Sequence, residues 1–185
     1  MKSGVKVTAD NAQAILDALK SLTRKEVLVG IPEEASARED SPFSNAGIGY
    51  VNEYGSPAQN IPPRPHLIPG VKVAEPKTMP QLKFAAQAAL DGHETAAIKS
   101  LHVAGRLAVQ GVHVLLKAAN FTPLADSTVE ARARRGTKGR KGAKAEMARR
   151  AAGESAGTGT AKPLYDTGKY RDSITYVVRD KDADS

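Results

Sequence analysis

The residue types that most often carry chemistry are sparse in this chain, which has four histidines and no cysteine. His102 and His113 fall on one face of a predicted helix but are eleven residues apart. That separation is about 16 Å along a helix, too far for one metal ion to bridge. His93-Glu94 lacks the second histidine of an HExxH zinc site. We therefore predict no metal and no cofactor, and expect the helical histidines to lie on a solvated face.

Two short motifs resemble hydrolase signatures. Gly153 to Gly157 reads GESAG and matches the GxSxG nucleophile elbow, which requires a strand before it, a helix after it and a later histidine. The preceding residues look helical instead, and the last histidine is His113. Asp166-Thr167-Gly168 matches the aspartic protease triplet, but a second carboxylate would be needed. Asp and Gly are common turn residues, so we predict a turn there and no enzyme.

A strongly basic segment holds the whole charge excess of the chain. Between residues 132 and 150 there are nine basic side chains and one acid, whereas the 185-residue chain has a net charge of +7. The nine are Arg132, Arg134, Arg135, Lys138, Arg140, Lys141, Lys144, Arg149 and Arg150. Its glycine spacing fits no phosphate-binding loop. Residues 132–161 are predicted to be a basic Gly/Ala-rich excursion, and within it we expect residues 136–159, which have almost no large apolar side chain, not to fold by themselves.

The basic segment has two interpretations, which the sequence leaves open. Lys and Arg on such a segment neutralise phosphates without regard to base sequence. No aromatic side chain that would stack on single-stranded bases occurs between Phe121 and Tyr165, so any nucleic-acid contact is expected to be with a duplex. Alternatively, the segment is a solvated loop or pairs with an acidic protein surface.

A proline-rich stretch, residues 61–70, follows Glu53-Tyr54-Gly55. Its prolines are Pro62, Pro63, Pro65 and Pro69. Each proline fixes its own φ and pushes the preceding residue toward extended backbone. Residues 61–69 are therefore predicted to form a stiff arm, which loses little entropy when it docks on a neighbouring subunit. We predict that Pro62, Pro63, Arg64 and Pro65 lie at a subunit contact. Glu53 is a candidate partner for Arg64, either within one subunit or between neighbouring subunits.

The surrounding patterns predict one α+β domain over residues 1–185, with a small mixed or antiparallel sheet covered by helices. Expected strands are 5–7, 26–31 and 173–179, and expected helices are 11–22, 79–90 and a long amphipathic one over 95–119. Residues 32–47 are predicted to be a surface loop, and Asp126 to Glu130 to open a short helix. Gly105 and Gly111 inside the long helix indicate a close neighbour, unless a helix of this length simply tolerates them.

No apolar run is long enough to span a bilayer, and the first residues lack the apolar stretch of a signal peptide. We expect no membrane association and synthesis in the cytoplasm.

Three groups of segments carry a family resemblance. The chain resembles the neck and tail-completion proteins of tailed bacteriophages, which join head to tail. The likeness rests on IGYVNEYG at 48–55 with IPPRPHL at 61–67, NFTPL at 120–124 with STV at 127–129, and KPLYDTG at 162–168 with RDSITY at 171–176. At the position of His66 the family typically has an aromatic residue.

The resemblance implies a non-enzymatic α+β virion protein located in the neck between head and tail. It implies a homo-oligomeric ring of six copies around the DNA exit channel, in contact with the connector and with tail tube or terminator proteins. Glu53, Tyr54, Pro62, Pro63, Arg64 and Pro65 would then lie at the subunit interface. The basic segment would face duplex DNA or an acidic partner protein. A tail terminator and a free, sequence-independent DNA-binding module are the alternatives.

Overall fold

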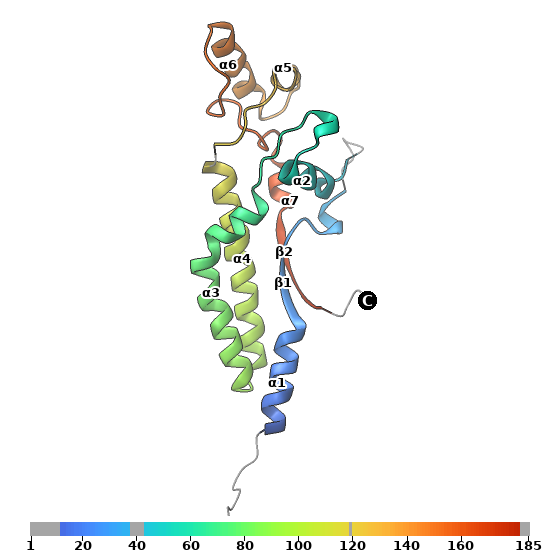
Figure 1. The fold of residues 1–185 in the computed structure, drawn as a ribbon, viewed down its shortest axis with the longest axis vertical. Coiled ribbons are helices and arrows are strands. Elements are labelled where there is room, and N and C mark those ends of the chain that lie inside the picture. Colours follow the sequence, from blue (N-terminus) through green and yellow to red (C-terminus); the bar gives the residue numbers. More distant parts are fainter. Residues whose placement is uncertain (1–11, 38–42, 119, 182–185) are drawn as a thin grey trace, which may run out of the picture.

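A computed structural model describes residues 12–37, 43–118 and 120–181 of the chain. The described residues form seven α-helices, two short 3-10 turns and one two-stranded sheet (Figure 1). The elements are α1 (Ala12–Arg24), β1 (Lys25–Gly30), η1 (Glu33–Ala35), α2 (Asn45–Tyr54), η2 (Pro57–Gln59), α3 (Leu67–Leu90), α4 (Glu94–Ala118), α5 (Asp126–Arg134), α6 (Arg140–Ala151), α7 (Lys169–Ser173) and β2 (Thr175–Asp180).

The two strands are antiparallel, with Leu28 opposite Val177 and Val29 opposite Tyr176. The sheet packs against α4, so the predicted α+β class with a small antiparallel sheet covered by helices is confirmed. The predicted strand at 173–179 begins two residues later, because Lys169–Ser173 forms the short helix α7. The predicted strand at 5–7 lies outside the described residues.

The long helices α3 and α4 form a hairpin that packs backbone against backbone. A Cβ placed on Gly70 would lie 2.5 Å from Val112 Cα, and one on Gly111 would lie 2.5 Å from the Gly70 carbonyl oxygen. Both distances are far below van der Waals contact, so neither position has room for a side chain. The close approach expected at Gly111 is confirmed.

The expectation of an extended arm is wrong beyond residue 66. Helix α3 begins at Leu67, not near residue 79, and contains Pro69 in its first turn and Pro76 and Pro80 further along. Proline is tolerated in a first turn because the N–H there has no helical partner. Inside the helix it removes a hydrogen bond and favours a bend. Figure 1 shows α3 changing direction along its length.

The predicted surface loop at 32–47 is also too long. Its last residues belong to α2, which begins at Asn45 and runs to Tyr54, so that Glu53 and Tyr54 are helical. The Ser44 side chain accepts a hydrogen bond from the Gly47 N–H at 3.1 Å. This N-cap satisfies one of the free donors of the first turn and explains why the helix starts there.

Two separate apolar cores stabilise the molecule. The body core contains Val112, Leu116, Tyr170 and Ile174, with partly buried side chains from β1 and α2 around it. A second core lies at the far end of the elongated molecule in Figure 1 and contains Leu124, Val129, Ala133, Ala143 and Ala161. We call residues 124–161 the head. Within the whole chain the basic segment is folded, since small alanine side chains pack α5 against α6 and Leu124 and Val129 from outside the segment complete this core.

Candidate functional site

Glu53 connects α2 to the start of α3. Its Oε2 accepts hydrogen bonds from the backbone N–H groups of His66, at 2.7 Å, and Leu67, at 2.9 Å. Its Oε1 accepts one from the N–H of Ile68 at 3.1 Å. Because these donors lie at the positive end of the α3 dipole, a carboxylate is well placed there. Glu53 is buried and acts within its own subunit.

His66 is fully buried beneath this carboxylate and contacts Tyr170. Its Nδ1 lies 2.8 Å from the carbonyl oxygen of Arg64, and its Nε2 is hydrogen-bonded to the Tyr170 hydroxyl. A neutral ring that donates from Nδ1 and accepts at Nε2 satisfies both contacts. Burial lowers the pKa of His66, although the Arg64 carbonyl and the Glu53 charge oppose the shift. Burial also raises the pKa of Tyr170, so both groups are neutral near pH 7.

Arg64 points into the protein instead of toward Glu53. Its Nε donates to the Thr122 carbonyl oxygen at 2.9 Å and its Nη2 to that of Pro123 at 3.0 Å. The predicted Glu53–Arg64 pair within the subunit is therefore wrong. Burial lowers the pKa of Arg64, and the two carbonyl oxygens supply the hydrogen bonds that a buried guanidinium needs. This contact fixes the proline-rich segment to the chain that follows α4.

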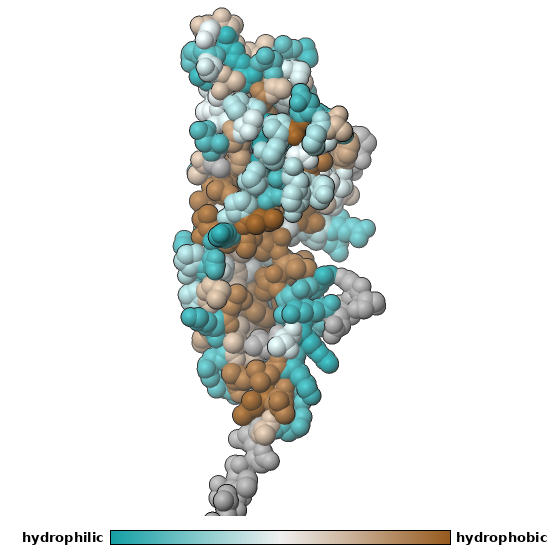
Figure 2. All heavy atoms as spheres, in the orientation of Figure 1, coloured by the Kyte–Doolittle hydropathy of each residue, from teal (hydrophilic) through white to brown (hydrophobic). Residues whose placement is uncertain are grey.

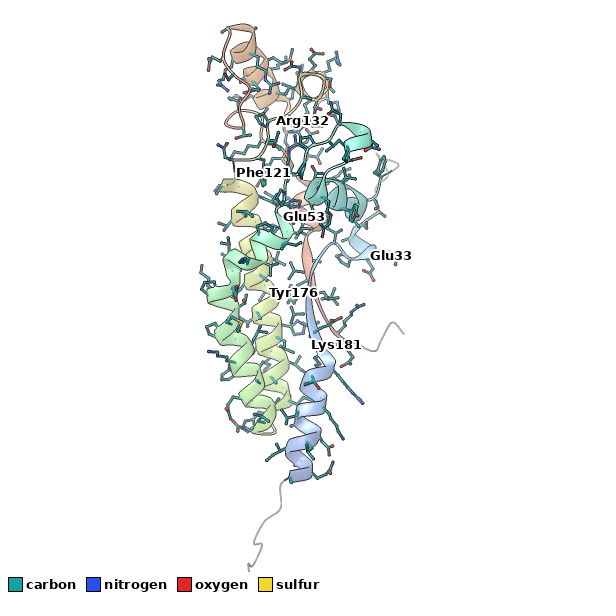
Figure 3. All side chains as sticks on the ribbon, viewed as in Figure 1. Glu33, Glu53, Phe121, Arg132, Tyr176 and Lys181 are labelled. Atoms are coloured by element: carbon teal, nitrogen blue, oxygen red, sulfur yellow. The ribbon has the colours of Figure 1, made fainter. Side chains whose placement is uncertain are left out.

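The six predicted interface residues thus divide into two groups. Glu53 and Arg64 are buried, and Pro62 is half-buried. Tyr54, Pro63 and Pro65 are exposed, and the Tyr54 ring packs against Tyr50 with 5.0 Å between centroids. The predicted contact with another subunit therefore depends on these exposed side chains. Figure 3 shows Glu53 in the interior, between α2 and the start of α3.

A buried carboxylate, Glu146, organises the head. It accepts hydrogen bonds from Arg149 Nη1 at 2.8 Å, Arg150 Nε at 3.0 Å and the Gly157 N–H at 2.8 Å, and a further one from the Thr160 hydroxyl. Burial alone would raise the pKa of Glu146, but these hydrogen bonds and the Arg149 charge outweigh it and lower the pKa to about 2. The only acid of the basic segment therefore ties α6 to the loop after it.

Arg132 joins the head to the body. Its Nη1 donates to the carbonyl oxygens of Lys162, at 2.8 Å, and Tyr165, at 3.3 Å. Its Nε lies 3.8 Å from Asp166 Oδ2, and Arg135 Nη1 lies 3.5 Å from the same oxygen. Burial lowers the pKa of Arg132, while the charge of Asp166 raises it. Asp166 also accepts a hydrogen bond from the Thr137 hydroxyl at 2.6 Å, so the segment before α7 is tied to the head.

The nine basic residues therefore do not form one uniform surface. Arg132, Arg135, Arg149 and Arg150 are paired with carboxylates inside the head or at its junction with the body. Arg134 lies 4.0 Å from Glu130 on the surface of α5. Four exposed cations make no ion pair with any described residue, namely Lys138, Arg140, Lys141 and Lys144. We call these four the α6 cations, because they lie at or just before the start of α6.

A cleft of about 1130 Å³ separates the head from the body. Pro62, Pro63 and Arg64 line it on one side and Arg132 and Arg135 on the other, so the two regions singled out by the sequence meet here. Figure 3 shows Arg132 in the head and Phe121 just beyond the end of α4. The guanidinium groups of Arg64 and Arg132 are already occupied by carbonyl oxygens. The cleft could therefore bind a partner by its shape and by the apolar surface of its prolines, but these two arginines are not free to react or to bind a ligand.

The remaining histidine predictions are partly wrong. His113 is half-buried, with Nε2 3.1 Å from the Arg171 carbonyl oxygen, and the His102 ring packs edge-on against Tyr176. His93, which lies just before α4 and not in a helix, is exposed. The described residues contain no group of three or more His, Cys, Asp or Glu side chains that would hold a metal ion. As expected, the residues before the GESAG motif are helical, because α6 runs to Ala151.

Large apolar side chains are exposed along the body. On α3 they are Ile68, Val71, Val73, Met79, Leu82, Phe84 and Leu90. On α1 they are Ile15, Leu16 and Leu19. Figure 2 shows hydrophobic surface along the body and mainly hydrophilic surface over the head. Contiguous apolar surface of this kind marks sites of protein interaction. No described helix is long and apolar enough to cross a bilayer.

Comparison with known proteins yields no match to a family model, to a curated protein or to a solved structure. The sequence reasoning missed His66, Tyr170 and Glu146 as organising residues. Only Glu146 has a signal in the sequence, as the single acid among nine bases. The contact between His66 and Tyr170 joins residues 104 positions apart, which no local pattern reveals.

Proposed function

We propose that this chain is a structural virion protein of the tailed-phage neck, a tail-completion or head-to-tail joining subunit that assembles into a ring around the DNA exit channel. The sequence resemblance suggests this role. The observation that supports it most is the division of the molecule into a cationic head and a body with exposed apolar helices. Such a subunit has separate surfaces for DNA and for neighbouring proteins.

The α6 cations suit a duplex that moves past the protein. They sit on a head held by the buried Glu146 network, and they have no carboxylate partner among the described residues. Contacts from Lys and Arg to phosphates are independent of base sequence and weaken as salt rises. A channel that must pass every sequence of a genome requires this kind of contact.

The exposed apolar side chains of α1 and α3 suit assembly. A soluble monomer rarely exposes so many large apolar groups on neighbouring helices. Two different apolar surfaces on one subunit fit a head-to-tail contact, which closes into a ring when the rotation between subunits allows it.

The decisive experiment is to locate the protein in assembled particles. We expect mass spectrometry to find it in purified virions and electron microscopy to place it as a ring between connector and tail. Absence from purified particles would overturn the proposal. A position at the upper end of the tail tube would identify the tail terminator instead.

A second experiment tests the α6 cations with the double variant K141E/K144E. We expect weaker binding to duplex DNA and a salt dependence that is shallower by roughly two phosphate contacts. The matched control is K77E/K83E, which makes the same charge change at exposed positions of α3. Equal losses in the two variants would show that only net charge matters and would remove the head from the DNA contact.

A further inference from the structure

The outer edge of β2 carries backbone groups that face away from β1. The Lys181 N–H donates to the Arg24 carbonyl oxygen at 2.6 Å, in register with the ladder between β1 and β2. Hydrogen-bonded pairs alternate with non-bonded pairs in an antiparallel ladder, so the N–H and C=O groups of Tyr176 and Val178 point outward. No described residue is hydrogen-bonded to these outward groups. Two-stranded sheets are marginal by themselves, and such an edge is a template for a further strand.

Helix α4 presents a separate face beside this edge. Helix α3 contacts β1 as well as α4, so it lies on the β1 side of the sheet. The face of α4 on the β2 side is marked by Arg106, whose Nη1 is 3.5 Å from the Tyr176 hydroxyl. His102 packs edge-on against the same ring, which Figure 3 shows between β2 and α4. A strand added to β2 would therefore lie over this face of α4.

This face of α4 is cationic. Lys99 and Arg106 are exposed on it, seven residues apart, which is about 10 Å along the helix. Neither forms an ion pair with any residue that the structure describes. The carboxylates of the sheet are already paired with basic residues of the opposite strand, namely Glu26 with Arg179 and Asp180 with Lys25. The edge of β2 thus combines open backbone groups with cations that have no acidic neighbour.

We propose that the edge of β2 binds an extended acidic segment of a partner protein as a third strand. The backbone of the segment pairs with Tyr176 and Val178, as in other cases of strand addition. Alternate side chains of the segment face α4, where two carboxylates about 7 Å apart fall between Lys99 and Arg106. The other side chains lie beside Val177, which is 39% exposed, so β-branched apolar residues suit them.

Charge also argues against a second copy of this chain as the occupant. Pairing two β2 edges would place the α4 helices of both copies side by side beneath one sheet. Their cations would then meet, and like charges brought together at an interface disfavour the complex. An acidic segment neutralises the same cations. The inference goes beyond the proposed function and does not depend on where the protein works.

Amide hydrogen exchange followed by NMR tests the contact. The probe is a capped peptide of alternating valine and glutamate, and the control is a peptide of alternating valine and lysine. We expect the glutamate peptide to slow exchange at Tyr176 and Val178 and to leave Val177 unchanged, because the Val177 N–H already faces β1. Only an added strand produces this alternation. Equal protection by the lysine peptide, or no protection by either, would overturn the inference.

The double variant K99E/R106E tests the role of charge. We expect it to bind the glutamate peptide about tenfold more weakly, since two attractive contacts at the edge become repulsive. The matched control is K77E/K83E, which makes the same charge change at exposed positions of α3. Equal losses in the two variants would show that net charge alone attracts the peptide, and would overturn recognition at this edge.

A proline variant tests the backbone contact. Val178→Pro removes an N–H that faces away from β1, so the ladder of the sheet itself is kept. Val178→Ala is the control, because it shortens the same side chain and keeps the N–H. We expect Val178→Pro to lose the peptide and Val178→Ala to retain it. Equal binding by the two variants at equal thermal stability would overturn strand addition, and would leave the proposed place in the virion untouched.

Discussion

The ring of Tyr176 on β2 lies directly against Gly105 on α4. A Cβ at position 105 would stand 2.2 Å from Tyr176 Cδ2 and 2.6 Å from its Cγ. The sheet approaches the helix this closely only because residue 105 has no side chain, which confirms the close neighbour expected at this glycine. The same ring packs against His102, one turn earlier on α4.

Gly105→Ala should destabilise the protein, although alanine is the better helix former. The added methyl group forces the Tyr176 ring off α4, and overpacking of this kind costs about 1–3 kcal/mol, against about 1 kcal/mol gained in helix propensity. Chemical denaturation followed by circular dichroism measures the net loss. Gly47→Ala is the control, since its Cβ would make only ordinary contacts at 3.4 Å or more. A Gly105→Ala protein as stable as wild type would contradict the packing described.

Glu146→Gln should loosen the head. The substitution keeps the size of the side chain but removes the buried carboxylate that Arg149 and Arg150 share, which leaves each arginine only its exposed partner, Glu154 or Asp126. Losing one partner of a buried ionic network costs roughly 2–4 kcal/mol. We expect faster amide exchange at Gly157 and along α6, with α3 and α4 unchanged. Glu130→Gln on the exposed surface of α5 is the matched control. Uniform loss of protection across the whole chain would argue against a separate head core.

The stability of the head should fall in acid because of Glu146. The pKa of Glu146 is lowered from 4.5 to about 2, so the folded head binds the proton less well than the unfolded chain. Its contribution is fully present above pH 4.5 and disappears as the pH falls toward 2. Thermal unfolding between pH 6 and 2 should therefore show a larger loss in wild type than in Glu146→Gln. If the melting temperatures of the two proteins fell in parallel with pH, Glu146 would not be the source of the acid sensitivity.

His66 should make the body less stable in mild acid. Burial lowers the pKa of His66 below 6.5 in the folded protein. Just below pH 6.5, His66 therefore binds a proton in the unfolded chain but stays neutral in the folded protein. Stability is then greatest above pH 6.5 and declines as the pH falls toward the lowered pKa. His66→Phe should flatten the melting temperature between pH 7.5 and 5. His93→Phe, at an exposed position, should keep the wild-type slope.

Tyr170→Phe should cost about 1–3 kcal/mol, because it leaves the buried Nε2 of His66 without its donor. The loss should be present at pH 7.5, where His66 is neutral and its Nε2 needs that donor. Urea denaturation at pH 7.5 measures it. Ser173→Ala, which removes only a bond from Ser173 Oγ to the Tyr170 carbonyl, is the nearby control. Equal and negligible effects would show that the His66 contact contributes little.

Some elements could be predicted from local pattern alone. The period of apolar residues predicted α4 within one residue at each end, and β-branched runs predicted both β1 and most of β2. These patterns work because the side chains face one core along a regular element. The start of α3 could not be predicted in this way. The prolines favour extended chain at residues 61–69. The helix nevertheless starts at Leu67, because Glu53 accepts hydrogen bonds from three backbone N–H groups there and Gly70 packs against α4.

The sequence by itself determined the class of fold, the long amphipathic helix and the location of the excess positive charge, since these follow from residue type and period. Tertiary structure alone decided which charged side chains are exposed and able to contact another molecule. Arg64 and Arg132 turn inward to carbonyl oxygens, Arg149 and Arg150 turn to Glu146, and the α6 cations remain exposed. A charged side chain looks the same in a sequence whether it is solvated or buried. Only the groups folded around it supply the hydrogen bonds that make its burial possible.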